Sequence, residues 1–476
     1  MTTAHGPHDA NPHGQTVSWG LLGTVSFGAL LSSMTASVIN VALPDIARDF
    51  QVDPSAAAWV ILAFLLTVTV LLLVAGRIGD MAGHGRMYMA GSAVFGLASV
   101  GCAVASSVGW LVGWRVVQGA GASLVMATAP ALLTRAVPSS RRGFALGFLS
   151  TSVYVGLTVG PPVGGELMRV LGWRSVFYAM FAGSVLILIA SFRALPRAKP
   201  ERASPRFDFA GAAVIAVGTL AFLLASTRGP AWGWAHPATL TTAAVPAALL
   251  PVLIWIESRQ DAPMLDLALF RSVVFSASCI AAVLNYITLF IAIYLLPFAL
   301  RDGQHMEPSA VGRVLAAQAG GMALFAWASG WLSDHVGARW LAAGGMLVVS
   351  IAVVALALDW PTSGVATPAA YMFVCGAGTG VFISPNSSAL MGAAPRDRQG
   401  IAGGMMGLSR TLGMTLGVAI ASGLFGTVFP EGRAAQWSSE ADAVVRLGLL
   451  VAGAVALLAG IVSLAGHDSV RRRAAR

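Results

Sequence analysis

Long apolar runs recur along the whole of this sequence. Stretches of about 20 residues with few charges follow one another from Trp19 to Ala465, and 59-WVILAFLLTVTVLLLVAG-76 is typical of them. A helix of about 20 apolar residues spans the hydrocarbon core of a bilayer. Only 10% of the residues are Asp, Glu, Lys or Arg, against about 25% in an average soluble domain. The pattern predicts a polytopic membrane protein and excludes a soluble globular one.

Charged residues and Pro- or Gly-rich turns divide the chain into fourteen candidate spans. They lie at 18–43, 57–76, 87–106, 110–134, 143–167, 173–192, 209–227, 238–257, 273–300, 309–333, 340–358, 366–392, 401–428 and 443–465. A transmembrane barrel would alternate apolar and polar residues over segments of about 10 residues, and these runs show no such alternation. The sequence therefore predicts an all-α protein with fourteen transmembrane helices.

The positions of Lys and Arg predict the orientation, because basic residues are retained in cytoplasmic loops. With the N-terminus in the cytoplasm, most of the 29 basic residues fall in cytoplasmic segments. Both termini are then cytoplasmic, as an even number of spans requires, and the protein lies in the cell membrane. The formal charge of +9 follows from this topology. No basic patch is interleaved with aromatic residues, so we expect no nucleic-acid partner.

An internal repeat predicts the domain organisation. The turn 76-GRIGDMAGHGR-86 follows the second span, and 330-GWLSDHVGAR-339 follows the tenth with the same Gly-x3-Asp-x2-Gly pattern and a later Arg. A matched turn in two halves predicts two six-helix bundles that move around a central site. The predicted units are a cytoplasmic tail (1–17), an N-terminal bundle (18–192), a linker with an inserted helix pair (193–272), a C-terminal bundle (273–465) and a basic tail (466–476).

Five segments of the chain are similar to signature motifs of the major facilitator superfamily, and within it of the 14-spanner drug:proton antiporters. They are 38-VINVALPDI-46, 76-GRIGDMAGHGR-86, 115-RVVQGAGA-122, 156-GLTVGPPVGG-165 and 410-RTLGMTLGVAI-420. The resemblance covers nearly the whole chain. It implies the major facilitator fold and the export of drugs or lipophilic metabolites by alternating access, in exchange for protons.

Glycine-rich motifs are the candidates for conformational change. The resemblance implies that the first turn latches the two bundles and that the motif of the fifth span is a hinge at their interface. Ordinary explanations also exist: a charged loop that obeys the positive-inside rule for the turn, and close helix packing for the glycines spaced four residues apart. The residues concerned are Gly76, Asp80, Gly83, Arg86, Asp334, Gly156, Gly160, Pro161, Gly164 and Gly165.

Two arginines lie inside predicted spans, where ionisable residues are costly and therefore candidates for function. Arg115 lies in the fourth span with Gln118 one helical turn away, and the family motif implies that this pair takes part in proton transfer or substrate binding. The alternative is an arginine that reaches the outer surface or is bound to backbone carbonyls. Arg410 lies deep in the thirteenth span, and an anchoring role between helices is as plausible there as a substrate contact.

Acidic residues fall at span ends or in loops, and this departs from the family pattern. Many similar antiporters have an Asp in the first span where this chain has Thr35. The remaining candidates for a proton site are Asp45 and Glu166, both at predicted outer ends. A lipophilic cation would find no counter-charge in the middle of the bundle. We therefore expect neutral or anionic amphiphiles to be the preferred substrates.

Polar side chains in the spans complete the candidate site, because Asn and Gln are expensive in hydrocarbon unless they are paired. The resemblance implies that the first, fourth, ninth and twelfth spans line a cavity, although hydrogen bonding between helices would explain each polar residue equally well. Besides Arg115, Gln118 and Arg410, the candidates are Thr35, Asn40, Tyr154, Asn285, Tyr286, Gln318 and Asn386.

The expected partners are a small amphiphilic molecule, protons and the lipid bilayer, and the expected state is a monomer. Another secondary transporter, carrying a lipid, a peptide or another metabolite, remains an alternative. An enzyme is not expected, because the chain has no nucleotide-binding loop and no HExxH or paired CxxC motif. The three cysteines, at 102, 279 and 375, lie in apolar spans without metal-ligand spacing, so we expect no cofactor.

Overall fold

A computed structural model describes residues 18–137, 142–195, 209–233, 235–257, 259, 267–362, 364–395, 399–429 and 437–465. The two predicted terminal tails and most of the linker 193–208 lie outside these residues. The described part of the chain consists of helices and short connections, and it contains no strand. The predicted all-α class is therefore confirmed.

The helices follow the predicted apolar runs. They are α1 (Trp19–Asp49), α2 (Pro54–Ala82), α3 (His84–Ala103), α4 (Val108–Ala136), α5 (Arg142–Leu171), α6 (Arg174–Ala194), α7 (Phe209–Trp232), α8 (Pro237–Glu257), α9 (Val273–Phe298), α10 (Pro308–Val336), α11 (Ala338–Leu358), α12 (Ala366–Ala393), α13 (Gln399–Gly426) and α14 (Ser439–Ala465), with the short helices η2 (Leu267–Arg271) and η3 (Ala299–Gly303). By length and apolar composition, ten segments of the described chain could cross a membrane. The predicted count of fourteen spans is not confirmed by this criterion, which α3, α5, α7 and α10 do not meet.

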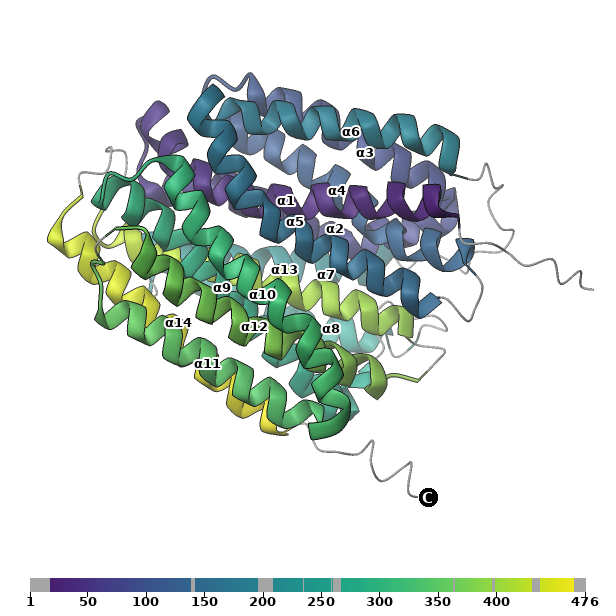
Figure 1. Ribbon diagram of the computed structural model, residues 1–476. Helices are drawn as coiled ribbons and strands as arrows, with labels where there is room; N and C mark the ends of the chain where they lie inside the picture. Colours follow the sequence, from purple (N-terminus) through teal and green to yellow (C-terminus); the bar gives the residue numbers. More distant parts are fainter. Residues whose placement is uncertain are drawn as a thin grey trace, which may run out of the picture.

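The same packing pattern occurs twice in the chain. In the first six helices, α1 packs against α5 and α6, and α4 packs against α2 and α3. In the last six, α9 packs against α13 and α14, and α12 packs against α10 and α11. We call α1–α6 the N-terminal half and α9–α14 the C-terminal half. Helix α7 lies against α2, α13 and α8, so it contacts both halves (Figure 1).

The two ends of the helical bundle differ in how closely the halves approach. We call the end where α1 begins and α14 ends the proximal end, and the opposite end the distal end; they lie toward the right and the left of Figure 1. The axes of α5 and α10 are close together at the distal end and spread apart toward the proximal end (Figure 1). Where α5 faces α10, the two halves therefore meet mainly at the distal end.

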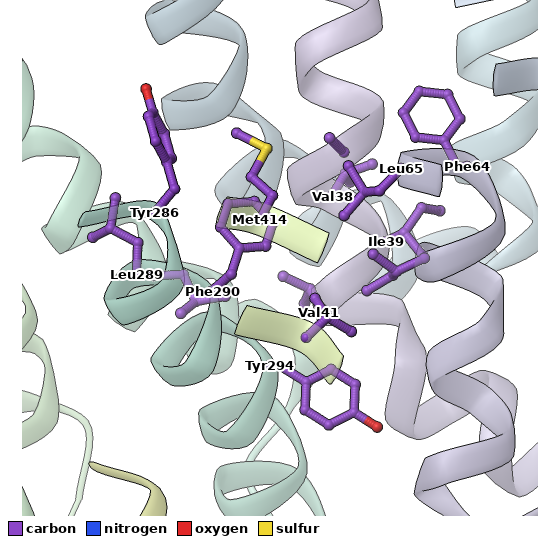
Figure 2. Packing of buried hydrophobic residues seen from close by; sticks show 14 of the residues in the cluster. Val38, Ile39, Val41, Phe64, Leu65, Tyr286, Leu289, Phe290, Tyr294 and Met414 are labelled. Atoms are coloured by element: carbon purple, nitrogen blue, oxygen red, sulfur yellow. The ribbon is translucent and has the colours of Figure 1, made fainter. Parts of the chain in front are cut away.

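A buried apolar cluster extends across both halves. Figure 2 shows its central part, where side chains of α1 and α2 in the N-terminal half meet side chains of α9 and α13 in the C-terminal half. The labelled residues are Val38, Ile39 and Val41 of α1, Phe64 and Leu65 of α2, Tyr286, Leu289, Phe290 and Tyr294 of α9, and Met414 of α13. Dispersion contacts of this kind hold membrane helices together, since lipid tails are as apolar as the side chains.

Candidate functional site

Arg115 is fully buried in the N-terminal half. Its Nε–H donates to the backbone oxygen of Val60 in α2 at 2.7 Å, and Nη1 donates to Oε1 of Gln118 at 2.5 Å. The guanidinium also lies 4.3 Å from the ring centre of Phe64, an arrangement that attracts a cation to the face of the ring. Gln118 Nε2 donates to Oγ of Ser99 in α3 at 2.8 Å. The predicted pair therefore ties α4 to α2 and α3, and only Nη2 of the arginine lacks a partner in the described residues.

The polar residues of α1 face different neighbours. Thr35 donates to the backbone oxygen of Leu31 at 2.9 Å and lies 3.1 Å from the sulfur of Met180 in α6. Asn40 is completely buried, and its amide nitrogen donates to the carbonyl of Ala36 within its own helix at 3.0 Å. Its Oδ1 has no hydrogen-bond partner among the described residues. Thr35 is thus satisfied within the N-terminal half, whereas Asn40 keeps a free acceptor.

The polar residues of the C-terminal half also include some with hydrogen-bond partners and one, Asn285, without any in the described residues. Asn386 donates from Nδ2 to the backbone oxygen of Ser278 at 3.1 Å, which joins α12 to α9, and Gln318 Nε2 lies 3.8 Å from the Sγ of Cys375. Asn285 is fully buried in α9, and neither its Nδ2 nor its Oδ1 has a partner in the described part of the chain.

Three other predicted site residues are less informative. Tyr286 is buried in α9 beside Met414, in the central cluster of Figure 2. Arg410 is half-buried in α13, and no hydrogen bond or ion pair with a described residue involves its side chain. Tyr154 belongs to α5, but its side chain lies outside the part that the structure describes.

The two repeated turns have nearly the same backbone geometry. Gly83 joins α2 to α3 with φ +94° and ψ 122°, and Gly337 joins α10 to α11 with φ +97° and ψ 138°. Residues with a side chain rarely adopt such angles, which explains a glycine at both positions. Gly76 lies in α2 and packs toward Ala127, and Arg86 is exposed. The side chains of Asp80 and Asp334 lie outside the described part of the structure.

Three glycines of α5 form a close contact with α1. A Cβ atom added to Gly156 would overlap the backbone oxygen of Leu30, and one on Gly160 or Gly164 would overlap the side chain of Ser37 or Val38. Their spacing of four residues puts them on one face of the helix. This face holds the N-terminal half together; it does not meet the other half.

A different face of the same motif meets the C-terminal half. A Cβ on Gly165 would lie 2.7 Å from the backbone oxygen of Pro308 and 3.3 Å from the Cα of Gly312 in α10. A Cβ on Gly312 would lie 2.7 Å from the backbone oxygen of Pro161. The contact between α5 and α10 at the distal end therefore depends on the absence of side chains at these two positions.

The two candidate proton sites have different surroundings. Glu166 is exposed and pairs with Arg169, one turn along the same helix, with Nε 3.0 Å from Oε1. Asp45 lies at the distal end of α1, where Oδ1 accepts from Arg48 Nη1 at 3.3 Å and from Arg301 Nε of η3 at 3.0 Å. Asp45 therefore forms a hydrogen bond with the other half, whereas the interaction of Glu166 with the other half is the electrostatic attraction of Arg313 in α10.

Sequence reasoning did not single out Arg48, Arg301 and Asp302. Arg48 forms an ion pair with Asp302, which belongs to η3, and also donates to the backbone oxygen of Arg301 at 3.1 Å. In the sequence these residues are ordinary charges at the ends of apolar runs. One signal was present: an acid and a base follow both the first and the ninth span, which end on the same side of the membrane.

No group of three His, Cys, Asp or Glu side chains in the described residues is arranged to hold a metal ion. Among the described residues, the buried polar side chains inside the helices include amides, hydroxyls and the guanidinium of Arg115, while the buried carboxylate of Asp53 caps the distal start of α2. Such a set can recognise a ligand by hydrogen bonds, and Arg115 supplies positive charge.

Comparison with known proteins identifies the family. The family model of the major facilitator superfamily matches residues 25–282 and again 278–475. The multidrug resistance protein Stp of Mycobacterium tuberculosis is 31% identical over 83% of this chain and 73% of its own. The riboflavin transporter RibZ of Clostridioides difficile is 29% identical over 86% and 88%. The tetracenomycin C resistance and export protein of Streptomyces glaucescens is 27% identical over 87% and 78%.

A solved structure shares the fold. The bacterial homologue of the human lysosomal transporter Spinster, in an inward-facing and unoccupied conformation, superposes with a TM-score of 0.66 at 16% identity, covering 95% of this chain and 97% of that one. Both matches of the family model together cover nearly the whole sequence. The chain therefore belongs to the major facilitator superfamily, and it is a multi-pass membrane transporter and not an enzyme.

Proposed function

We propose that this transporter exports drugs or amphiphilic metabolites by alternating access, in exchange for protons. Relatives named for multidrug resistance and for tetracenomycin C export support the direction of transport. In this proposal the protein is a monomer, and α1–α14 all cross the cell membrane. Helices α1–α6 and α9–α14 form the two moving bundles, and α7–α8 are the inserted pair. The proximal end faces the cytoplasm, in agreement with the distribution of basic residues.

The observation that carries the proposal is a set of buried polar atoms without partners. They are Oδ1 of Asn40, both amide atoms of Asn285 and Nη2 of Arg115, and each lies within an apolar helix. A polar group in hydrocarbon that makes no hydrogen bond costs several kcal/mol. A bound molecule, or the other conformation of the transport cycle, would supply the missing partners. We propose that these three residues contact the substrate, with Tyr286, Arg410, Gln318 and Tyr154 as further candidates.

The charges of this set favour neutral or anionic amphiphiles over lipophilic cations. Asp53, at the distal start of α2, is the one buried carboxylate among the described residues, whereas Arg115 offers an unpartnered N–H group inside α4. Transport into inside-out vesicles would test the preference, with an anionic and a quaternary ammonium dye of similar size compared directly. Strong transport of the cation that does not change in Arg115→Ala would contradict it.

Proton coupling needs a group that titrates, and Asp45 and Glu166 are the proposed candidates. The test is the change in internal pH when substrate is added to proteoliposomes that contain the wild type, Asp45→Asn or Glu166→Gln. We expect the pH change per transported molecule to fall in at least one variant. If neither variant alters it, the proton passes through another group.

The relative named as a riboflavin transporter supports a second candidate function, the transport of another kind of solute such as a metabolite. In this second function the proton coupling is different or absent. The direction of substrate movement under an imposed proton gradient distinguishes the two functions. Exchange for protons predicts that the substrate accumulates against its own concentration gradient, and that a proton ionophore abolishes this accumulation. A uniporter would only equilibrate its substrate, with or without the ionophore.

A further inference from the structure

Four charged side chains join the two halves at the distal end of the molecule. Arg48 of α1 pairs with Asp302 of η3, while Arg301 of η3 pairs with Asp45 of α1 at 2.9 Å. The two ion pairs are crossed, because each helix end contributes one acid and one base. The backbone oxygen of Arg301 accepts an additional hydrogen bond from Arg48 at 3.1 Å. Each charge thus has a partner of opposite sign on the other half.

These pairs are partly open to solvent. The exposed fractions of the side chains are 44% for Arg48, 24% for Arg301, 20% for Asp45 and 11% for Asp302. An ion pair with such access to water contributes little by itself, and small networks contribute more. The four charges are therefore suited to hold the halves together reversibly, since water can solvate each of them when they separate.

Other contacts at the same end also join the halves. Gly165 of α5 meets α10 at Pro308 and Gly312, and the hydroxyl of Tyr294 in α9 donates to the backbone oxygen of Pro54 in α2. The side chain of Val41, about one helical turn before Asp45 in α1, is buried and lies near Tyr294 of α9 (Figure 2). Separation of the halves at the distal end would break the ion pairs and uncover Val41.

We propose that Asp45, Arg48, Arg301 and Asp302 form a latch that closes the distal side of the transport pathway and must open in every cycle. This inference rests on the proposed alternating-access function. It gives Asp45 a role in closing the pathway, in addition to its place among the candidates for the proton site. Arg301 and Asp302, which lie immediately after α9, become residues that control substrate release.

Charge reversal with rescue would test the latch. The reporter is Val41→Cys in a protein whose three native cysteines are replaced, and the readout is the rate of modification by a membrane-impermeant maleimide added outside intact cells. Because an exposed ion pair is worth a few-fold in equilibrium and reversal adds repulsion, we expect Arg48→Asp or Asp302→Arg to raise the rate about fivefold or more. The double variant should return toward the wild-type rate. Arg301→Asp and Asp45→Arg should behave in the same way.

Two controls separate opening from unfolding. Arg174 pairs with Asp49 at the same end, but both residues belong to the N-terminal half. Arg174→Gln should therefore leave the labelling of the cysteine at position 41 unchanged. A second reporter, Ala98→Cys, is buried in α3 and should stay unreactive in every variant that is folded.

The latch is refuted if single reversals label at the wild-type rate while Ala98→Cys stays protected, or if the double variants label no more slowly than the single ones. These rates require neither substrate nor a proton gradient. If charge reversal changes the labelling but the protein exports nothing, the latch stands and the proposed function is refuted. If the protein exports its substrate but charge reversal leaves the labelling unchanged, the proposed function stands and the latch is refuted.

Discussion

Gly165 of α5 and Gly312 of α10 cross so closely that a Cβ on Gly165 would lie 3.3 Å from the Cα of Gly312 and 2.7 Å from the backbone oxygen of Pro308. Both obstacles are backbone atoms, which cannot move aside as the end of a side chain can. Gly165→Ala should destabilise the distal-closed state by about 1–3 kcal/mol, as overpacking does. We expect faster modification of Val41→Cys from outside and a lower transport rate.

The matched control for Gly165→Ala is Gly113→Ala. Gly113 lies in α4, and a Cβ at that position would meet no atom within 4 Å. Replacement of a helical glycine by alanine in open space is favourable by about 1 kcal/mol. Gly113→Ala should therefore leave labelling and transport unchanged. Equal labelling of the two variants would show that the crossing does not control the closed state.

The repeated turns should respond alike to a side chain. Gly83 and Gly337 both have φ above +90°, and a Cβ on Gly83 would meet no atom within 4 Å, so the cost of alanine there is backbone strain without a clash. Such strain is of order 1–3 kcal/mol. We expect Gly83→Ala and Gly337→Ala to lower the thermal unfolding midpoint in detergent, whereas Gly344→Ala in α11, also in open space, should not. Two unchanged midpoints would contradict the strain argument.

Gln118 should matter for stability through its two neighbours. It accepts from Arg115 and donates to Ser99, so Gln118→Leu leaves a buried guanidinium with one partner fewer. Leaving a buried donor unpaired costs about 1–3 kcal/mol, and more for a charged group. The free energy of unfolding should fall by at least this amount. Ser152→Ala, which removes only a hydrogen bond to Phe148 in the same helix, should cost far less, and equal losses would argue against a buried network.

The positions of the helices could be predicted from the sequence, because span length is set by the thickness of the bilayer. The predicted run 309–333 corresponds to Pro308–Val336, for example. The predicted ends of the helices are less accurate than their positions. The first predicted span ends at residue 43, whereas α1 continues to Asp49. The last six residues of α1, 44–49, include Asp45, Arg48 and Asp49, so hydropathy does not detect this end of the helix.

The faces of the helices could not be predicted in the same way. A helix inside a membrane protein is apolar on every side, so periodicity does not tell which side meets a neighbour. Thr35 was expected to line a cavity, and the structure pairs it with Leu31 and Met180. The glycine motif of α5 was treated as one surface, and it has two, one toward α1 and one toward α10. Contacts between distant segments, such as Arg48 with Asp302, need the tertiary structure.

Asn285 and Asn386 offer the sharpest test of the proposed substrate contacts. Asn386 donates to Ser278, so Asn386→Leu should lower the free energy of unfolding by about 1–3 kcal/mol. Asn285 has no partner in the described residues, so Asn285→Leu removes an unpaired buried amide and should leave stability unchanged or raise it. If Asn285 binds substrate, the same variant should nevertheless transport poorly, with a raised half-saturating substrate concentration. Unfolding in detergent and transport in proteoliposomes measure the two effects separately. A destabilised Asn285→Leu that still transports normally would identify the residue as a structural amide and remove it from the substrate site.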